Sequence, residues 1–72
     1  MMTQAVMMED MQIEEEIREL IERLRERRWS DEAIARELGC SGATIHRWRH
    51  RKQGVHMPRL VKRALEELLE RP

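Results

Sequence analysis

Two helix-start signals, eleven residues apart and separated by a glycine, constrain the fold of this chain most. Ser30 precedes two acidic residues, and a serine in that place typically caps the free amides of a first helical turn. Gly39 then supplies the left-handed position at which helices commonly end, and Ser41 caps another helix directly afterwards. The pattern predicts a short helix over residues 31–38, a tight turn and a second short helix.

Longer amphipathic stretches flank this pair. Apolar residues recur every three or four positions early in the chain, which predicts a first helix over about residues 11–28, capped by Asp10. The second short helix should end near Lys52. A connector then leads to Pro58, a residue suited to the first turn of a final helix. The apolar stripe of that helix comprises Leu60, Val61, Ala64, Leu65, Leu68 and Leu69.

The fold class that follows is all-α: a compact four-helix domain that contains a helix-turn-helix. Seventy-two residues leave room for one hydrophobic core. Residues 1–10 show no clear period and are predicted to form a flexible N-terminal tail, and residues 11–72 are predicted to form the domain.

The net charge of zero conceals a segregation of charge along the chain. Residues 1–26 hold eight acidic and three basic side chains, whereas residues 27–63 hold ten basic and three acidic ones. All three histidines also lie in the basic block. A basic block between acidic ends is typical of a protein that binds a polyanion, although the acidic helix could instead pair with the basic ones within the fold.

Several classes of protein are excluded or disfavoured by composition. The single cysteine, Cys40, rules out an internal disulfide and a four-cysteine zinc site, and it suits the cytoplasm. No apolar run is long enough to span a membrane. His46 and His50 lie four residues apart, but no local glutamate accompanies them as in a zinc protease, so no metal is expected. We expect no enzyme activity and no cofactor, because no nucleophile–base pair or phosphate-binding loop is present.

Some conspicuous residues are interpreted as structural. Trp29 and Trp48 are predicted to pack in the core rather than stack on bases, and Cys40 is predicted to be a buried, inert thiol. Ala35 and Gly39 are expected to be small because the two short helices nearly touch there.

The segment Asp31–His50 resembles the 20-residue helix-turn-helix signature of bacterial and phage DNA-binding regulators, with Ala35 between the helices and Gly39 in the turn. Ser41–Arg51, the basic loop after it and Pro58 are similar to the lambda-repressor-like (Cro/XRE) family. The resemblance implies a lambda-repressor-like domain whose second short helix enters the major groove of double-stranded DNA, which is wide enough for one α-helix.

That resemblance also implies a set of base contacts near the start of the second short helix. The candidates for base contact are Ala43, Thr44, His46 and Arg47, beside Gly42. Since Gly42 and Ala43 carry no polar side chain, specificity should rest on Arg47, which suits a bidentate contact with guanine.

Phosphate contacts are expected from the helix N-terminus and from the basic residues that follow. The candidates are Ser41, Gly42, Arg49, His50, Arg51, Lys52 and Arg59. Asp31 and Glu32 depart from the repressor pattern, because two carboxylates near the DNA backbone would be repelled by it.

The sequence therefore predicts a cytoplasmic, sequence-specific DNA-binding transcriptional regulator, a repressor of phage or plasmid type. A homodimer is expected through the long first helix or the final helix, with preference for the final one. Both the first helix and the stripe of Leu65, Leu68 and Leu69 offer more apolar surface than so small a core needs. One alternative is a DNA-recruitment protein in phage packaging, recombination or replication. Another is a module with a protein partner, such as an antitoxin or a polymerase inhibitor.

Overall fold

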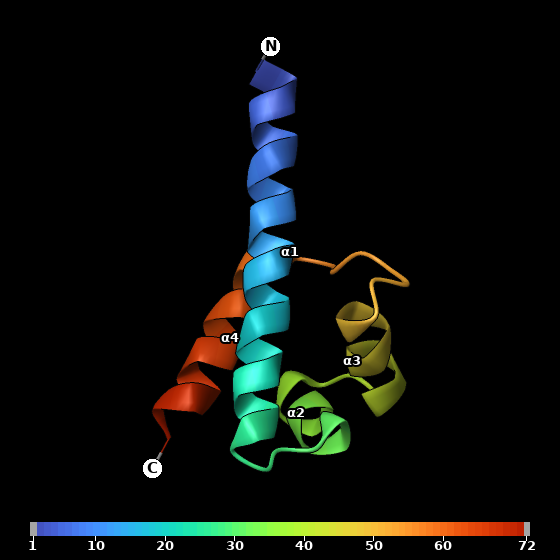
Figure 1. The fold of residues 1–72 in the computed structure, drawn as a ribbon, viewed down its shortest axis with the longest axis vertical. Helices are drawn as coiled ribbons and strands as arrows, with labels where there is room; N and C mark the ends of the chain where they lie inside the picture. The colour runs from blue at the N-terminus through green and yellow to red at the C-terminus, as the bar shows by residue number, and fades with distance from the viewer. Residues whose placement is uncertain (1, 72) are drawn as a thin grey trace.

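The computed structural model describes the backbone of residues 2–71 and the side chains of residues 11–71. Over this part of the chain the elements are α1 (Met2–Glu26), α2 (Asp31–Leu38), α3 (Gly42–Arg49) and α4 (Pro58–Glu70), with no strand between them. α4 lies along the C-terminal half of α1, while α2 and α3 lie on the other side, and the first turns of α1 project beyond the rest (Figure 1). The predicted all-α fold with a helix-turn-helix is confirmed.

One hydrophobic core joins the four helices and the connector before α4. It consists of Ile17, Leu20, Ile21, Leu24, Ile34, Ala35, Ile45, Trp48, Val55, Leu65 and Leu68. Trp29 and Cys40 are partly buried and pack against this core. With Trp48 inside the core, both tryptophans are structural, as expected. Val55 was not anticipated, because a single apolar residue in a polar connector has no periodicity to reveal it.

The apolar stripe of α4 is used differently from the expectation. Leu65 and Leu68 are fully or almost fully buried in the core, so they are not surplus surface for a dimer. Leu60 was expected to face inward with them, but 56% of its surface is exposed. The reason is that α4 packs mainly on α1, and Leu60 at its start borders an open groove that faces the helix-turn-helix.

Three helices end in the same way. One left-handed residue follows each: Arg28 (φ 73°) after α1, Gly39 (φ 77°) after α2 and Arg51 (φ 58°) after α3. In each case the next residue donates its backbone N–H to the carbonyl five positions earlier, at 3.0, 2.9 and 2.8 Å respectively. This is the Schellman arrangement, which satisfies carbonyls that would otherwise lack a partner. Glycine is therefore the exception among these three helix ends.

The predicted helix bounds hold for α2 and for the start of α4, and need correction for α1 and α3. α1 begins at Met2 rather than near residue 11, so Asp10 lies within the helix and is not its cap. The predicted flexible tail over residues 1–10 lies outside the residues whose side chains are described. α3 ends at Arg49 rather than near Lys52, because the left-handed Arg51 turns the chain away.

The connector between α3 and α4 is fixed to α1. The Val55 backbone N–H donates to the Glu14 Oε2 carboxylate oxygen at 3.3 Å. Met57 then adopts a left-handed conformation (φ 51°) directly before Pro58, which occupies the first turn of α4 as predicted. A residue that precedes proline normally prefers an extended backbone, so Met57 is strained. In the described residues, no helix is both long and apolar enough to cross a membrane.

Candidate nucleic-acid interface

The candidate recognition helix, α3, is capped as predicted. The Ser41 hydroxyl accepts a hydrogen bond from the Thr44 backbone N–H at 3.3 Å, and its oxygen lies 3.0 Å from the Thr44 hydroxyl. Ser30 caps α2 in the same way, accepting from the Ala33 N–H at 3.1 Å. Because each serine satisfies an amide that its helix leaves free, both helix starts are fixed locally.

One face of α3 points to the core and the opposite face to solvent. Ile45 and Trp48 are buried, and the exposed side chains are Ala43, His46, Arg47 and His50. The structure therefore gathers three of the four predicted base contacts, Ala43, His46 and Arg47, on one accessible face. The imidazole rings of His46 and His50 lie side by side there, with centroids 4.3 Å apart.

Thr44, the fourth predicted base contact, is positioned differently. It is half-buried at the side of α3, where its hydroxyl contacts that of Ser41. It also lines a groove of about 500 Å³ between the helix-turn-helix and α4. Thr44 is thus less accessible to DNA bound at the exposed face of α3 than the other three predicted base contacts are.

Of the two glycines, Gly42 lies against the neighbouring helix, whereas Gly39, where the sequence suggested a close approach, does not. A Cβ at Gly42 would lie 3.0 Å from Glu32 Cγ and 3.5 Å from Glu32 Cα, whereas one at Gly39 would meet nothing within 4 Å. Gly39 is required for its left-handed backbone instead. The stem of Glu32 therefore lies against the start of α3, where a phosphate would have to bind.

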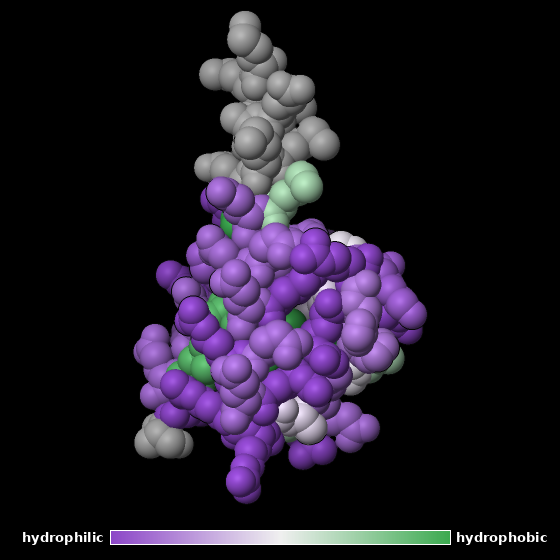
Figure 2. Space-filling view, in the orientation of Figure 1, coloured by the Kyte–Doolittle hydropathy of each residue, from purple (hydrophilic) through white to green (hydrophobic). Residues whose placement is uncertain are grey.

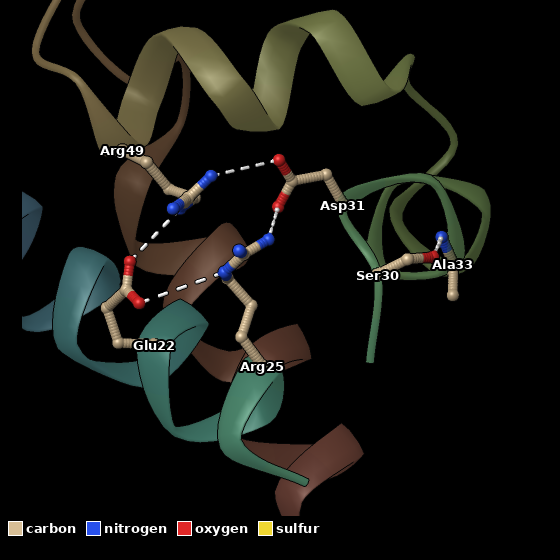
Figure 3. Close-up of polar contacts among 6 residues, drawn as sticks. All are labelled: Glu22, Arg25, Ser30, Asp31, Ala33 and Arg49. Carbon is tan, nitrogen blue, oxygen red and sulfur yellow. Dashed lines mark hydrogen bonds and ion pairs between the residues drawn. The ribbon is translucent and has the colours of Figure 1, made fainter. Parts of the chain in front are cut away.

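A ring of ion pairs ties α1, α2 and the end of α3 together (Figure 3). Arg49 donates to Glu22 at 3.0 Å and to Asp31 at 3.1 Å, and Arg25 lies 3.1 Å from Asp31 and 3.8 Å from Glu22. The side chains of Arg49 and Asp31 are only 16% and 19% exposed. Asp31, which the sequence suggested would repel DNA, is neutralised by two arginines within the fold.

Arg49, a predicted phosphate contact, is the most enclosed member of this ring. Burial by itself would lower the pKa of Arg49, but the hydrogen bond to Glu22 and the charge of Asp31 reverse this and raise the pKa above its usual value. The Arg49 guanidinium is therefore already paired with two carboxylates. In the free protein, Arg49 joins α3 to α1 and α2.

Arg51, another predicted phosphate contact, also has a partner on α1. Its two terminal nitrogens lie 2.6 and 2.9 Å from the two carboxylate oxygens of Glu15, a bidentate pair. Unlike Arg49, it remains 64% exposed. The other predicted phosphate contacts are exposed or at a helix start: Ser41, Gly42, His50, Lys52 and Arg59.

The sequence interpretation missed the carboxylates of Glu15 and Glu22, which hold these arginines. A signal was present, since four acidic residues recur at helical spacing on α1: Glu15, Glu19, Glu22 and Glu26. With Arg18, Arg23, Arg49 and Arg51 they line an open groove beside the end of α3. Periodicity identifies such a row, but it cannot say which cations face it.

The groove between the helix-turn-helix and α4 has a mainly apolar lining. Cys40, Trp48, Met57, Leu60 and Val61 are among its lining residues. Burial raises the pKa of the Cys40 thiol, so this cysteine stays protonated at neutral pH, as an inert thiol does. The Trp48 Nε1 atom is buried and has no hydrogen-bond partner within the described residues.

The face drawn in Figure 2 is mostly hydrophilic, with small apolar patches between the charged side chains. Within residues 11–71 no group of three or more histidine, cysteine or acidic side chains is arranged to hold a metal ion.

Comparison with known proteins agrees with this geometry. No curated protein and no solved structure matches the chain. The family model of a homeodomain-like domain matches residues 13–56, which span the second half of α1, the helix-turn-helix and most of the connector. A capped pair of short helices braced by a longer one, with an exposed basic face on the second, belongs to a helix-turn-helix domain that binds DNA. The chain is accordingly a member of the homeodomain-like domain family.

Proposed function

We propose that this protein is a sequence-specific, double-stranded DNA-binding transcriptional regulator of the cytoplasm that acts as a repressor by occupying an operator. The observation that carries the proposal is the exposed face of α3, where Ala43, His46 and Arg47 lie together opposite the buried Ile45 and Trp48. A helix held in this way can enter the major groove without disturbing the core.

The chemistry of this face suggests how a base sequence would be read. Arg47 has no ion pair within the described residues, so its guanidinium is available for a bidentate contact with guanine. His46 can donate or accept one hydrogen bond, and Ala43 can contact a thymine methyl group. We assign phosphate contacts to the start of α3 at Ser41 and Gly42, and to His50, Arg51 and Lys52. A closer relationship to lambda-repressor-like regulators is part of this proposal, supported by Pro58 at the start of α4.

The test is DNA binding by the wild type and by Arg47→Ala, with a duplex selected from a degenerate pool and a random duplex, at several salt concentrations. Wild type should prefer the selected duplex. Arg47→Ala should weaken that binding by about 1–3 kcal/mol and relax the preference at one base pair, because it removes a bidentate base contact.

Arg23→Ala is the matched control, since it removes the same charge from α1 and leaves α3 intact. Arg23 is exposed and has no ion pair within the described residues. Equal binding to all duplexes by the wild type, or equal losses in the two variants, would contradict sequence-specific reading by α3. Equal binding to all sequences would instead favour a recruitment role.

We also propose that the regulator binds as a homodimer, through the outer face of α4. The first half of this helix carries Arg59, Lys62 and Arg63, and the second half carries Glu66, Glu67 and Glu70. This order opposes the helix dipole, which favours acidic residues at the start and basic residues at the end. Antiparallel pairing of two α4 helices would set each basic half against an acidic half, which compensates for the unfavourable order.

The apolar groove beside α4 supports the same interface. Two of the exposed large apolar side chains among the described residues, Met57 (55%) and Leu60 (56%), lie on its lining. A two-fold interface needs a patch that carries both a projection and a recess. Leu60 is a projection directly beside a recess floored by Trp48, so two copies of this patch can complement each other. A groove of this kind also favours the second candidate function, a module that binds another protein.

A further inference from the structure

The bidentate pair between Arg51 and Glu15 places a carboxylate where a DNA phosphate would bind. Arg51 directly follows the candidate recognition helix, and its nitrogens lie 2.6 and 2.9 Å from the Glu15 carboxylate oxygens. Phosphate and carboxylate both accept the same two parallel hydrogen bonds from a guanidinium. The two acceptors cannot occupy one guanidinium edge at the same time.

Glu15 is held in place by contacts that do not involve Arg51. Arg18 donates to Glu15 Oε1 at 2.7 Å and, through its Nε, to the Trp48 carbonyl oxygen at 2.9 Å. Arg18 also lies 3.6 Å from Glu14 on the same helix. Because Arg18 bridges Glu15 and the end of α3, the carboxylate stays beside Arg51 without depending on it.

Arg51 differs from Arg49 in how readily it can be released. Arg49 is 16% exposed and bound by two carboxylates, one of them the largely buried Asp31, so its release would break two ion pairs at once. Arg51 is 64% exposed and paired with one carboxylate, a kind of contact that contributes little to stability. Arg51 can therefore change partners while the fold persists.

We propose that Glu15 is an internal competitor of DNA for Arg51, so that the acidic side of α1 stands in for the DNA backbone in the free protein. This inference rests on the proposed DNA-binding function and deepens it, because it gives Glu15 a role in setting affinity. A bidentate phosphate contact made by the two terminal nitrogens of Arg51 requires the Glu15 pair to open first. Contacts made by Arg47 require no such opening. The competition therefore weakens the protein's contacts with DNA phosphates more than its contacts with DNA bases.

Glu15→Gln is the variant that tests the proposal, since it keeps the size of the side chain and removes its charge. Glu19→Gln is its matched control: Glu19 lies one turn later on the same side of α1, is exposed and has no ion pair within the described residues. Both variants raise the net charge by one. Any general electrostatic gain in DNA binding is therefore common to the two, and only Glu15→Gln releases Arg51.

Affinity for a random duplex should be about two- to fivefold higher in Glu15→Gln than in Glu19→Gln, at low salt, the range expected for release of an exposed ion pair. The same comparison in an Arg51→Ala background should show no difference between the two variants. Circular dichroism melts should show that the two single variants and the two double variants are all folded at the temperature of the binding measurements.

Equal affinities of Glu15→Gln and Glu19→Gln would overturn the inference and leave the proposed function intact. An advantage of Glu15→Gln that persists without Arg51 would also overturn it, because the gain would then not come from this arginine. Absence of DNA binding in the wild type and in every variant would overturn the proposed function itself.

Discussion

Arg28 and Arg51 occupy backbone positions that helix ends usually assign to glycine. Their φ angles of 73° and 58° are left-handed, as is that of Gly39 at 77°. For a residue with a side chain this conformation costs about 1–2 kcal/mol, because Cβ approaches the carbonyl oxygen that follows it. The hydrogen bonds of the Schellman arrangement, made in both cases, offset part of this cost.

Replacement of Arg28 by glycine should therefore stabilise the protein. The left-handed strain of about 1–2 kcal/mol disappears, and glycine costs about 0.5–1 kcal/mol in conformational entropy, so the free energy of unfolding should rise by up to about 1.5 kcal/mol. Urea denaturation followed by circular dichroism measures this difference. Arg23→Gly is the control, because the same replacement inside α1 should lower stability by about 1 kcal/mol. A lower free energy of unfolding for Arg28→Gly would mean that the Arg28 side chain stabilises the fold by more than its left-handed backbone destabilises it.

Among the elements, α4 shows most directly how a helix serves two purposes. Its inner side supplies Leu65 and Leu68 to the core, and its outer side leaves Leu60 exposed. Lys62 joins α4 to Glu16 of α1, and that hydrogen bond raises the pKa of Lys62. The remaining charges of α4 have the unfavourable order described above, and a second α4 helix in antiparallel orientation would compensate for it.

The dimer prediction belongs to this element. At tens of micromolar, the wild type should sediment as a dimer and Leu60→Gln as a monomer, because the substitution places an amide in the apolar contact. Met11→Gln is the matched control, since Met11 is 68% exposed on α1, away from the groove. It should leave the dimer unchanged. A monomeric wild type, with and without DNA, would rule out the α4 interface.

At the scale of the whole molecule, ionic contacts position α3 relative to α1. The core joins all four helices, but the end of α3 is attached to α1 mainly by Arg18, Arg49 and Arg51. Asp31 completes the ring from α2 (Figure 3). Since two members of that ring are largely buried, salt screens it less than it screens a surface pair.

Asp31→Asn should lower the free energy of unfolding by about 1–2 kcal/mol, because Arg25 and Arg49 lose a shared carboxylate that is largely shielded from water. Glu32→Gln is the control: it removes a charge from the same first turn of α2, where Glu32 has no ion pair within the described residues. Urea denaturation at low and high salt should show a larger loss for Asp31→Asn under both conditions. Equal losses would mean that the ring contributes no more than the interaction of a carboxylate with the helix dipole.

How far the fold could be predicted depended on whether the determining contacts are local. The bounds of α2 were predicted because Ser30 and Gly39 fix both ends through their own backbone neighbours. The end of α3 was missed because Arg51, not a glycine, adopts the left-handed turn. In the candidate site, the family resemblance pointed to Ala43, His46 and Arg47, but neither it nor helical spacing revealed that Arg49 faces Glu22 and Asp31.

The sequence by itself determined α2, the serine caps of α2 and α3 and the basic outer face of α3, since helical spacing and capping act over a few residues. The tertiary structure decided which of the basic side chains remain available. Arg49 and Arg51 meet carboxylates of α1 that lie 27 and 36 positions earlier, and only the packing of the helices brings such distant charges within hydrogen-bond distance. It also decided that Gly42, rather than Gly39, lies against the neighbouring helix, because that contact depends on the angle at which α2 and α3 meet.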